Sequence, residues 1–187
     1  MPRANPYFPL ESGKSRTLKG VRTDGEPIVK YGVLTVQGPG QKILGVSTTT
    51  IVDEAFEDGR LVERTFDYFA ADKDGKVWHF GEDVTNFGFD DAGKGTGTDT
   101  DSTWRAGMNG AKPGITMPDQ AIVGLTLFQE HAPEDNAMDY AEVLAINLVI
   151  EGPGGAFRDV VKTFEGSTTD ADLREYKYCP RRRDDQG

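Results

Sequence analysis

The sequence predicts an all-β protein: a single antiparallel β-barrel or strongly curved sheet, with one short helix and a long polar loop. Three observations carry this prediction. Short runs rich in β-branched and aromatic residues recur along the chain. Glycine, proline and aspartate separate these runs, and the 23 glycines and 10 prolines interrupt the chain too often for long helices. No helical period lies between the runs, so an antiparallel sheet is favoured over alternating strands and helices.

The expected strands follow one another at regular spacing. The glycine- and proline-rich segment 37–41 (QGPGQ) is expected to connect the first two strands. The segment 152–155 (GPGG) is expected to form the turn of a hairpin near the C-terminus. The predicted strands span 30–36, 42–52, 61–71, 76–80, 124–131, 142–151, 157–164 and 173–178.

Three segments between the strands are expected to differ from them. The segment 133–143 (PEDNAMDYAEV) begins with proline followed by acids, which favours one short helical turn. The segment 90–102 (DDAGKGTGTDTDS) has no core-forming residues and is predicted to be a long exposed loop. The segment 111–119 (AKPGITMPD) is bounded by prolines and is predicted to be extended.

Length and composition indicate one domain. A chain of 187 residues can bury a hydrophobic core, so we expect a single β domain over 1–187, with its core at 5–178 and a solvated tail at 179–187. The net charge of −10 argues against a nucleic-acid partner, because an acidic chain repels phosphate. No apolar run is long enough to form a transmembrane segment, and the sequence as given does not begin with the hydrophobic segment of a signal peptide.

The most informative stretch is 63–83, in which two aromatic-rich runs flank an Asp-Gly turn signal. If Asp74 and Gly75 are the two turn residues, Asp67 faces Glu82 on the next strand. Like charges placed opposite each other on a sheet repel. Such a pair beside aromatic rings suggests a proton, a metal ion or a cationic ligand.

The register of this hairpin decides which side chains share the face of Asp67. An even-numbered loop places Trp78, Phe80 and Glu82 on that face, whereas an odd-numbered loop places His79 there. Two interpretations remain open. The face is exposed to solvent and its acids are surface residues, or it lines the lumen of a barrel that holds a ligand.

The candidate ligand-binding residues combine carboxylates with aromatic rings. Carboxylates would bind polar or cationic groups, and the rings would stack on a sugar or another planar ligand. The ligand-binding residues predicted on this basis are Asp67, Trp78, Phe80 and Glu82, with Glu63 and Glu142 as neighbouring candidates.

A divalent metal ion is the one cofactor for which the sequence offers candidate ligands. The chain has two histidines, and both stand beside acids. Imidazole and carboxylate groups together ligate zinc, iron or manganese. The single cysteine, Cys179, cannot build a thiolate site alone. The candidate metal ligands are His79, Asp83, Glu130 and His131.

Several segments together resemble a largely uncharacterised family of secreted bacterial β-rich proteins. They are NPYFPL at 5–10 followed by Gly13, DYFAADKDGKVWHFGED at 67–83, AKPGITMP at 111–118 and AEVL at 141–144. The resemblance covers residues 5 to about 178 and implies a secreted or periplasmic antiparallel β domain. It supplies no established activity, and the family pattern has tyrosine at the positions of His79 and His131.

Three functions of different classes are consistent with the sequence. The leading hypothesis is an extracytoplasmic binding protein for a small or glycan-like ligand. The second is a metal-assisted or carboxylate-driven hydrolase or lyase that uses His79, His131 and nearby acids. The third is a structural protein of the cell envelope. Whether the protein is an enzyme, and its oligomeric state, are left open by the sequence.

Overall fold

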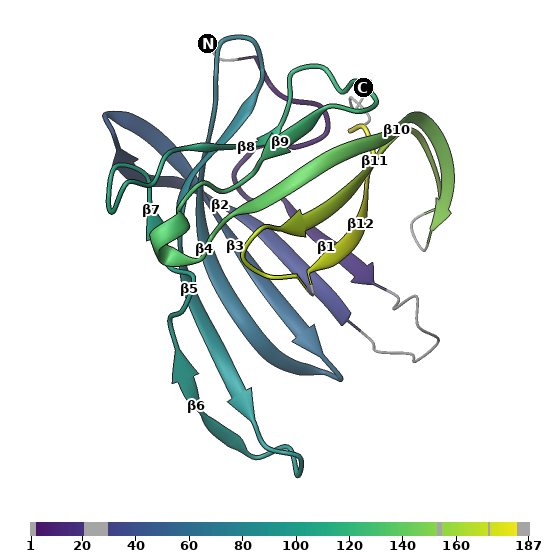
Figure 1. Ribbon diagram of the computed structural model, residues 1–187. Helices are drawn as coiled ribbons and strands as arrows, with labels where there is room; N and C mark the ends of the chain where they lie inside the picture. The colour runs from purple at the N-terminus through teal and green to yellow at the C-terminus, as the bar shows by residue number, and fades with distance from the viewer. Residues whose placement is uncertain (1–2, 21–29, 153–154, 172, 183–187) are drawn as a thin grey trace.

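The computed structural model describes residues 3–20, 30–152, 155–171 and 173–182, and these are almost entirely β structure. Two antiparallel sheets face each other, and the larger one curls into a half-barrel (Figure 1). The predicted all-β class with a strongly curved sheet is therefore confirmed. Within the described residues, no helix has the length and apolar character needed to span a membrane.

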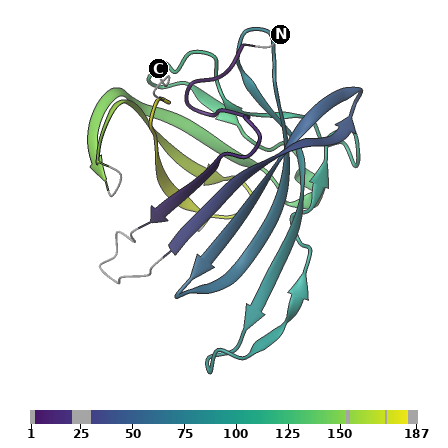
Figure 2. The ribbon, with the colours of Figure 1, turned by 180° about the vertical axis from the view of Figure 1, so that it is seen from behind.

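The larger sheet has the strand order β1-β2-β3-β4-β5-β6, and β7 and β8 also pair with β5. Its long strands run side by side in the view from behind (Figure 2). Its strands are β1 Ser15–Gly20, β2 Lys30–Ile43, β3 Val46–Glu57, β4 Arg60–Ala71, β5 Val77–Phe89, β6 Gly95–Asp99, β7 Trp104–Arg105 and β8 Gly114–Met117.

The smaller sheet has the order β12-β11-β10-β9 and lies across the larger one (Figure 1). Its β10–β11 hairpin confirms the predicted pairing near the C-terminus, although residues 153–154 of the turn lie outside the described residues. The predicted short helical turn is a 3-10 turn, η1, just before β10. These elements are β9 Thr126–Phe128, η1 Pro133–Asp135, β10 Asp139–Gly152, β11 Gly155–Ser167 and β12 Arg174–Cys179.

The connection predicted at 37–41 is wrong. β2 continues through this segment and pairs with β3, with register shifts after Val36 and after Pro39. Such shifts let a strand accept glycine and proline without ending. The turn comes later, at Leu44 and Gly45, where φ is 49° and 82°.

The exposure predicted for 90–102 is confirmed, but part of this segment is a strand and not a loop. Gly95–Asp99 pairs with the end of β5 as the exposed strand β6. Asn86 Nδ2 donates a hydrogen bond of 2.7 Å to Asp99 Oδ1, which ties the two strands together. Main-chain pairing needs no apolar side chains, so the absence of core-forming residues did not exclude a strand.

The predicted tail begins too early. Cys179 is the last residue of β12, and it packs against a buried apolar cluster of the larger sheet. Beyond it, the Arg182 backbone N–H donates to the carbonyl of Pro6, so this part of the tail lies against the N-terminal segment. Residues 183–187 lie outside the described residues.

Apolar side chains cover both faces of β4 and β5. One cluster contains Tyr68, Phe80 and Trp104, and the other contains Phe69 and Val77. Each large apolar side chain that is fully buried stabilises the fold by about 1.5–3 kcal/mol. These strands therefore form an inner wall and not a surface hairpin.

Candidate functional site

The carboxylate of Asp72 shapes the turn between β4 and β5. Its Oδ1 accepts hydrogen bonds from the backbone N–H groups of Asp74, Gly75 and Lys76, at 2.9, 3.0 and 3.0 Å. Next to the turn, Ala71 lies opposite Val77, so the loop has an odd number of residues. The two-residue turn predicted at Asp74 and Gly75 is therefore wrong.

A bulge in β5 nevertheless places Asp67 opposite Glu82. Near the turn, Phe69 lies opposite His79, and one register shift separates this pair from the pair of Asp67 and Glu82. β5 takes three steps from His79 to Glu82, while β4 takes two from Phe69 to Asp67. As a result His79 and Glu82 both lie on the face of Asp67. The extra residue is accommodated at Gly81, where φ is 135°.

Asp67, His79 and Glu82 form a compact buried group. One potential ligand atom from each side chain lies within 4.8 Å of the other two. His79 Nε2 is 3.3 Å from Asp67 Oδ1, and His79 Nδ1 is 3.8 Å from Glu130 Oε1. The exposed fractions of Asp67, His79 and Glu82 are 9%, 3% and 8%. We call these four residues, Asp67, His79, Glu82 and Glu130, the acid–histidine cluster.

The aromatic residues predicted to accompany Glu82 lie elsewhere. Trp78 pairs with Ala70, so it lies on the opposite face of the hairpin, and its Nε1 donates to Asp72 Oδ2 at 3.0 Å. Phe80 packs with Tyr68 in the apolar cluster on that side. An even-numbered loop was expected to place both rings on the face of Asp67. The loop has an odd number of residues, so between the loop and the bulge each β5 side chain lies on the face opposite to the expected one.

The remaining carboxylates predicted for the ligand site are divided between two faces. Glu63, Thr65 and Asp67 alternate along β4 and therefore share one face. Thr65 Oγ1 donates a hydrogen bond of 3.0 Å to Glu63 Oε1. Glu142 lies on the small sheet between the buried Ala141 and Val143, so it points to the outer face.

The predicted metal ligands are not brought together as a set. His79 and Glu130 lie in the acid–histidine cluster. Asp83 lies on the other face of β5, where it accepts hydrogen bonds from Tyr68 and Arg105 at 2.7 and 2.5 Å. His131 packs against Phe128, with ring centroids 5.8 Å apart. Thus one histidine, and not both, lies among interior carboxylates.

Charged side chains of the small sheet complete the interior. Lys177 forms an ion pair of 2.5 Å with Glu165, and it also interacts electrostatically with Asp53 of the larger sheet and with Glu130. Its side chain is nevertheless 46% accessible to solvent, so water reaches this charged group. We call the region between the inner faces of the two sheets the chamber. Its charged residues are Asp53, Glu63, Asp67, His79, Glu82, Glu130, Asp139, Glu165 and Lys177.

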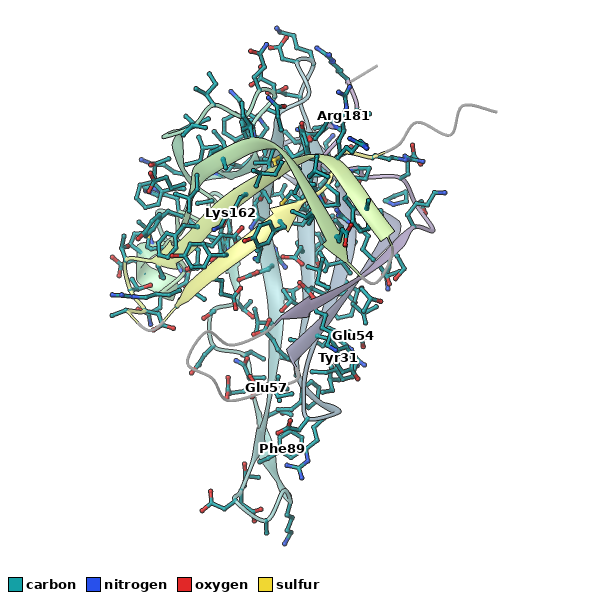
Figure 3. The ribbon with its side chains drawn as sticks, turned by 90° about the vertical axis from the view of Figure 1, so that its right-hand side faces the viewer. Tyr31, Glu54, Glu57, Phe89, Lys162 and Arg181 are labelled. Carbon is teal, nitrogen blue, oxygen red and sulfur yellow. The ribbon has the colours of Figure 1, made fainter. Side chains whose placement is uncertain are left out.

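Strand alternation separates the chamber from the outer surface. Figure 3 labels Glu54 on the larger sheet and Lys162 on the smaller one. Glu54 follows Asp53 and Lys162 precedes Thr163, and both Asp53 and Thr163 point inward. Because neighbouring residues of a strand point to opposite faces, Glu54 and Lys162 lie on the outer faces. The sequence prediction missed Asp53, because its strand was expected to end at 52; continuing the alternation from Ile51 would have placed it on the inner face.

Burial and mutual repulsion disfavour the ionised form of several chamber acids. Burial, reinforced by the charge of Asp67, raises the pKa of Asp53 to about 7. Burial also raises the pKa of Glu130 to about 7 although His79 opposes the shift, and it raises the pKa of Glu82 well above the ordinary value. Burial lowers the pKa of His79, but the neighbouring carboxylates outweigh it and the net shift is upward.

These shifts predict that the protein is less stable at pH 8 than at pH 5.5. A carboxyl whose pKa is higher in the folded state holds a proton that the unfolded chain has released, so stability falls as pH rises from its unfolded pKa to about 7. His79 acts in the same direction, because its pKa is also raised. Urea denaturation should give an unfolding free energy about 2 kcal/mol lower at pH 8.

Two asparagine variants test the origin of this pH dependence. Asp53→Asn should reduce the difference between pH 5.5 and pH 8, because it removes a titrating chamber acid. Asp101→Asn, in the exposed segment after β6, should leave it unchanged. A stability that increases from pH 5.5 to pH 8 would contradict the assignment.

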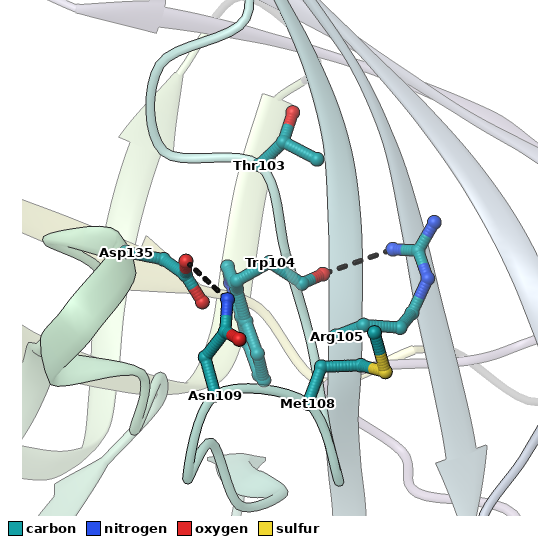
Figure 4. Close-up of a pocket in the computed structure, with 6 residues that line it drawn as sticks. All are labelled: Thr103, Trp104, Arg105, Met108, Asn109 and Asp135. Carbon is teal, nitrogen blue, oxygen red and sulfur yellow. Dashed lines mark hydrogen bonds between the residues drawn. The ribbon is translucent and has the colours of Figure 1, made fainter.

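A hollow on the outer surface lies beside the cluster. It has a volume of about 210 Å³ and is lined by Thr103, Trp104, Arg105, Met108, Asn109 and Asp135 (Figure 4). Two of its polar contacts are internal: Asn109 donates to Asp135 at 3.2 Å, and Arg105 donates to the carbonyl of Trp104 at 2.9 Å. The Trp104 ring also contacts His79, with centroids 5.1 Å apart, and so separates the hollow from the chamber.

Comparisons of the chain with protein-family models, with curated proteins and with solved structures find no match. The resemblance to secreted bacterial β-rich proteins, and the location outside the cytoplasm that it implies, therefore remain predictions.

Proposed function

We propose that the protein is a binding protein that holds a small cationic ligand in the chamber between its two sheets. The observation that carries the proposal is the buried pair of Asp67 and Glu82, which face each other across neighbouring strands. Among the described residues, neither carboxylate forms an ion pair with lysine or arginine. A bound cation would stabilise the ionised forms of both carboxylates.

The energetics of the chamber favour a cation as the ligand. Two buried carboxylates that face each other repel, and this repulsion is larger inside a protein than in water. Glu130 and Asp139 add to the negative charge near Glu82, whereas Lys177 is already engaged with Glu165. A ligand with positive charge would relieve this repulsion, and a neutral ligand would not.

The position of the aromatic rings argues for a cation over a sugar. A sugar site of the predicted kind needs rings beside the carboxylates, so that the sugar can stack while its hydroxyl groups are bound. Trp78 and Phe80 lie on the other face of the hairpin from Glu82. The rings that do lie beside the cluster, Phe69 and Trp104, are buried against His79 and are not free to stack on a sugar. With the export implied by the resemblance, we propose an extracytoplasmic cation-binding protein.

A thermal-shift panel at pH 7.5 tests this function. Putrescine, spermidine and divalent cations are compared with glucose and cellobiose. A ligand at one hundred times its Kd stabilises the native state by about 2.7 kcal/mol, which raises the Tm by about 5–10 °C. We expect at least one cation, and neither sugar, to give such a shift.

Glu82→Gln and Glu142→Gln form a matched pair of variants for this panel. Both exchange a strand glutamate for its neutral isostere, but Glu82 lies in the chamber and Glu142 on the outer face of the small sheet. The cation-induced shift should decrease in the first and persist in the second. A shift caused by sugars alone, or one lost equally in both variants, would contradict the proposal.

A further inference from the structure

We infer that Asp67, His79 and Glu82 form a binding site for a divalent first-row transition metal ion. The inference rests on the proposed function and makes it more specific, because it identifies the cation of the chamber as a metal ion. Four features of the cluster support it: an unpartnered ring nitrogen, a carboxylate beside the other ring nitrogen, converging carboxylates and an immobilised ring.

The first feature is His79 Nε2, a buried polar atom that makes no hydrogen bond. The residue is only 3% exposed and its side chain only 4%. Buried polar atoms in native proteins nearly always have a partner, and one without it calls for an explanation. Asp67 Oδ1 lies 3.3 Å from Nε2 without the geometry of a hydrogen bond. A metal ion between the two atoms would use both.

The second feature is the carboxylate of Glu130 beside the other ring nitrogen. Its Oε1 lies 3.8 Å from His79 Nδ1. With a metal ion on Nε2, the neutral ring would carry its proton on Nδ1, on the side of this carboxylate. Histidines that ligate metals typically have a carbonyl or carboxylate beside their second nitrogen.

The third feature is the convergence of oxygen atoms on the same point. Asp67 and Glu82 each offer a carboxylate oxygen within 4.8 Å of the histidine nitrogen. One imidazole with two carboxylates is a mixed set, which suits manganese, iron, cobalt or zinc better than calcium or magnesium.

The fourth feature is the fixed position of the imidazole ring. Phe69 stacks on His79 with centroids 4.6 Å apart, and Trp104 meets its edge at 5.1 Å. A ring packed on two sides loses little further freedom when a metal binds, so the site is organised in advance. A histidine that merely filled the core would need no carboxylates around it.

Metal binding to chelator-treated protein tests the inference. The protein is dialysed separately against Mn²⁺, Zn²⁺ and Co²⁺, with Mg²⁺ and Ca²⁺ for comparison, and bound metal is measured by elemental analysis. Titration calorimetry gives the Kd, and the visible absorption of bound Co²⁺ reports its ligands. We expect about one transition metal ion per chain, and a Kd for Mg²⁺ or Ca²⁺ at least tenfold weaker.

The two histidines of the chain supply the control. His79→Gln should weaken the Kd by at least tenfold and change the Co²⁺ spectrum, whereas His131→Gln should preserve both. Binding that survives His79→Gln, or that is lost only in His131→Gln, overturns the assignment. If putrescine or spermidine binds but no transition metal does, the metal inference fails and the proposed function stands. If no cation binds, both fail and the cluster is a structural ion-pair group only.

Discussion

Replacing Gly81 with alanine is expected to destabilise the protein by about 4 kcal/mol or to prevent folding. Gly81 has a φ of 135°, which alanine adopts only with strain of about 1–3 kcal/mol. An added Cβ would also lie 2.5 Å from the Trp104 carbonyl oxygen and 2.9 Å from Arg105 Cα. Both neighbours are backbone atoms of the paired strand β7, so relieving the overlap requires the strands to separate, at a further cost of about 1–3 kcal/mol.

Gly97→Ala is the matched control for this substitution. Gly97 has a φ of 139°, almost the same as Gly81, but an added Cβ would meet nothing within 4 Å. It should cost only the backbone strain, about 1–3 kcal/mol. Urea denaturation of both variants measures the difference, which is the contribution of the close approach. Equal losses would show that β5 and β7 do not lie as close as the structure places them.

The fold class could be predicted from the sequence because local patterns determine it. Runs of β-branched and aromatic residues form strands, and the turn formers between them break the chain wherever they occur. The sequence prediction was wrong where a local signal is compatible with two different structures. The segment 37–41 reads as a turn, yet its glycine and proline are accommodated as irregularities within β2. Only the pairing with β3 decides between these outcomes.

The candidate site was predictable in part. Strand alternation and an assumed turn gave the correct pairing of Asp67 with Glu82. The loop has an odd number of residues, however, and the bulge in β5 compensates for the difference. The correct pair was therefore predicted from an incorrect loop length. Because the bulge adds one residue to β5, His79 lies on the same face as Glu82, and Trp78 lies on the opposite face. Gly81 is the sequence signal for this bulge, since an isolated glycine in a strand often marks one.

The rest of the chamber depends on contacts between distant segments. Lys177 and Glu165 lie on neighbouring strands of the small sheet, while Asp53 lies on the larger one. No periodicity within a strand reveals which sheet it will face. The pairing of the two inner faces follows from the curvature of the larger sheet and the packing of the smaller one across it (Figure 1). These are properties of the whole fold.

Gly114→Ala is expected to cost about 3 kcal/mol and to weaken cation binding in the same variant. Gly114 pairs with His79 on one side, and an added Cβ would lie 2.0 Å from the Gln129 carbonyl oxygen on the other. Both are fixed backbone positions, so the segment that carries Glu130 would have to move away from His79. Stability and binding should therefore decline together, as measured by urea denaturation and by cation titration.

Gly95→Ala separates this steric effect from the general effect of adding a methyl group to a strand. Gly95 also lies in a strand, it lacks the left-handed φ, and an added Cβ there would meet nothing within 4 Å. Alanine at this position should change stability by less than about 1 kcal/mol, in either direction. If Gly114→Ala proved as mild as Gly95→Ala, the segment before His131 would not be held against β8. Glu130 would then lie too far from His79 to contribute to the chamber, and the acid–histidine cluster would consist of Asp67, His79 and Glu82 alone.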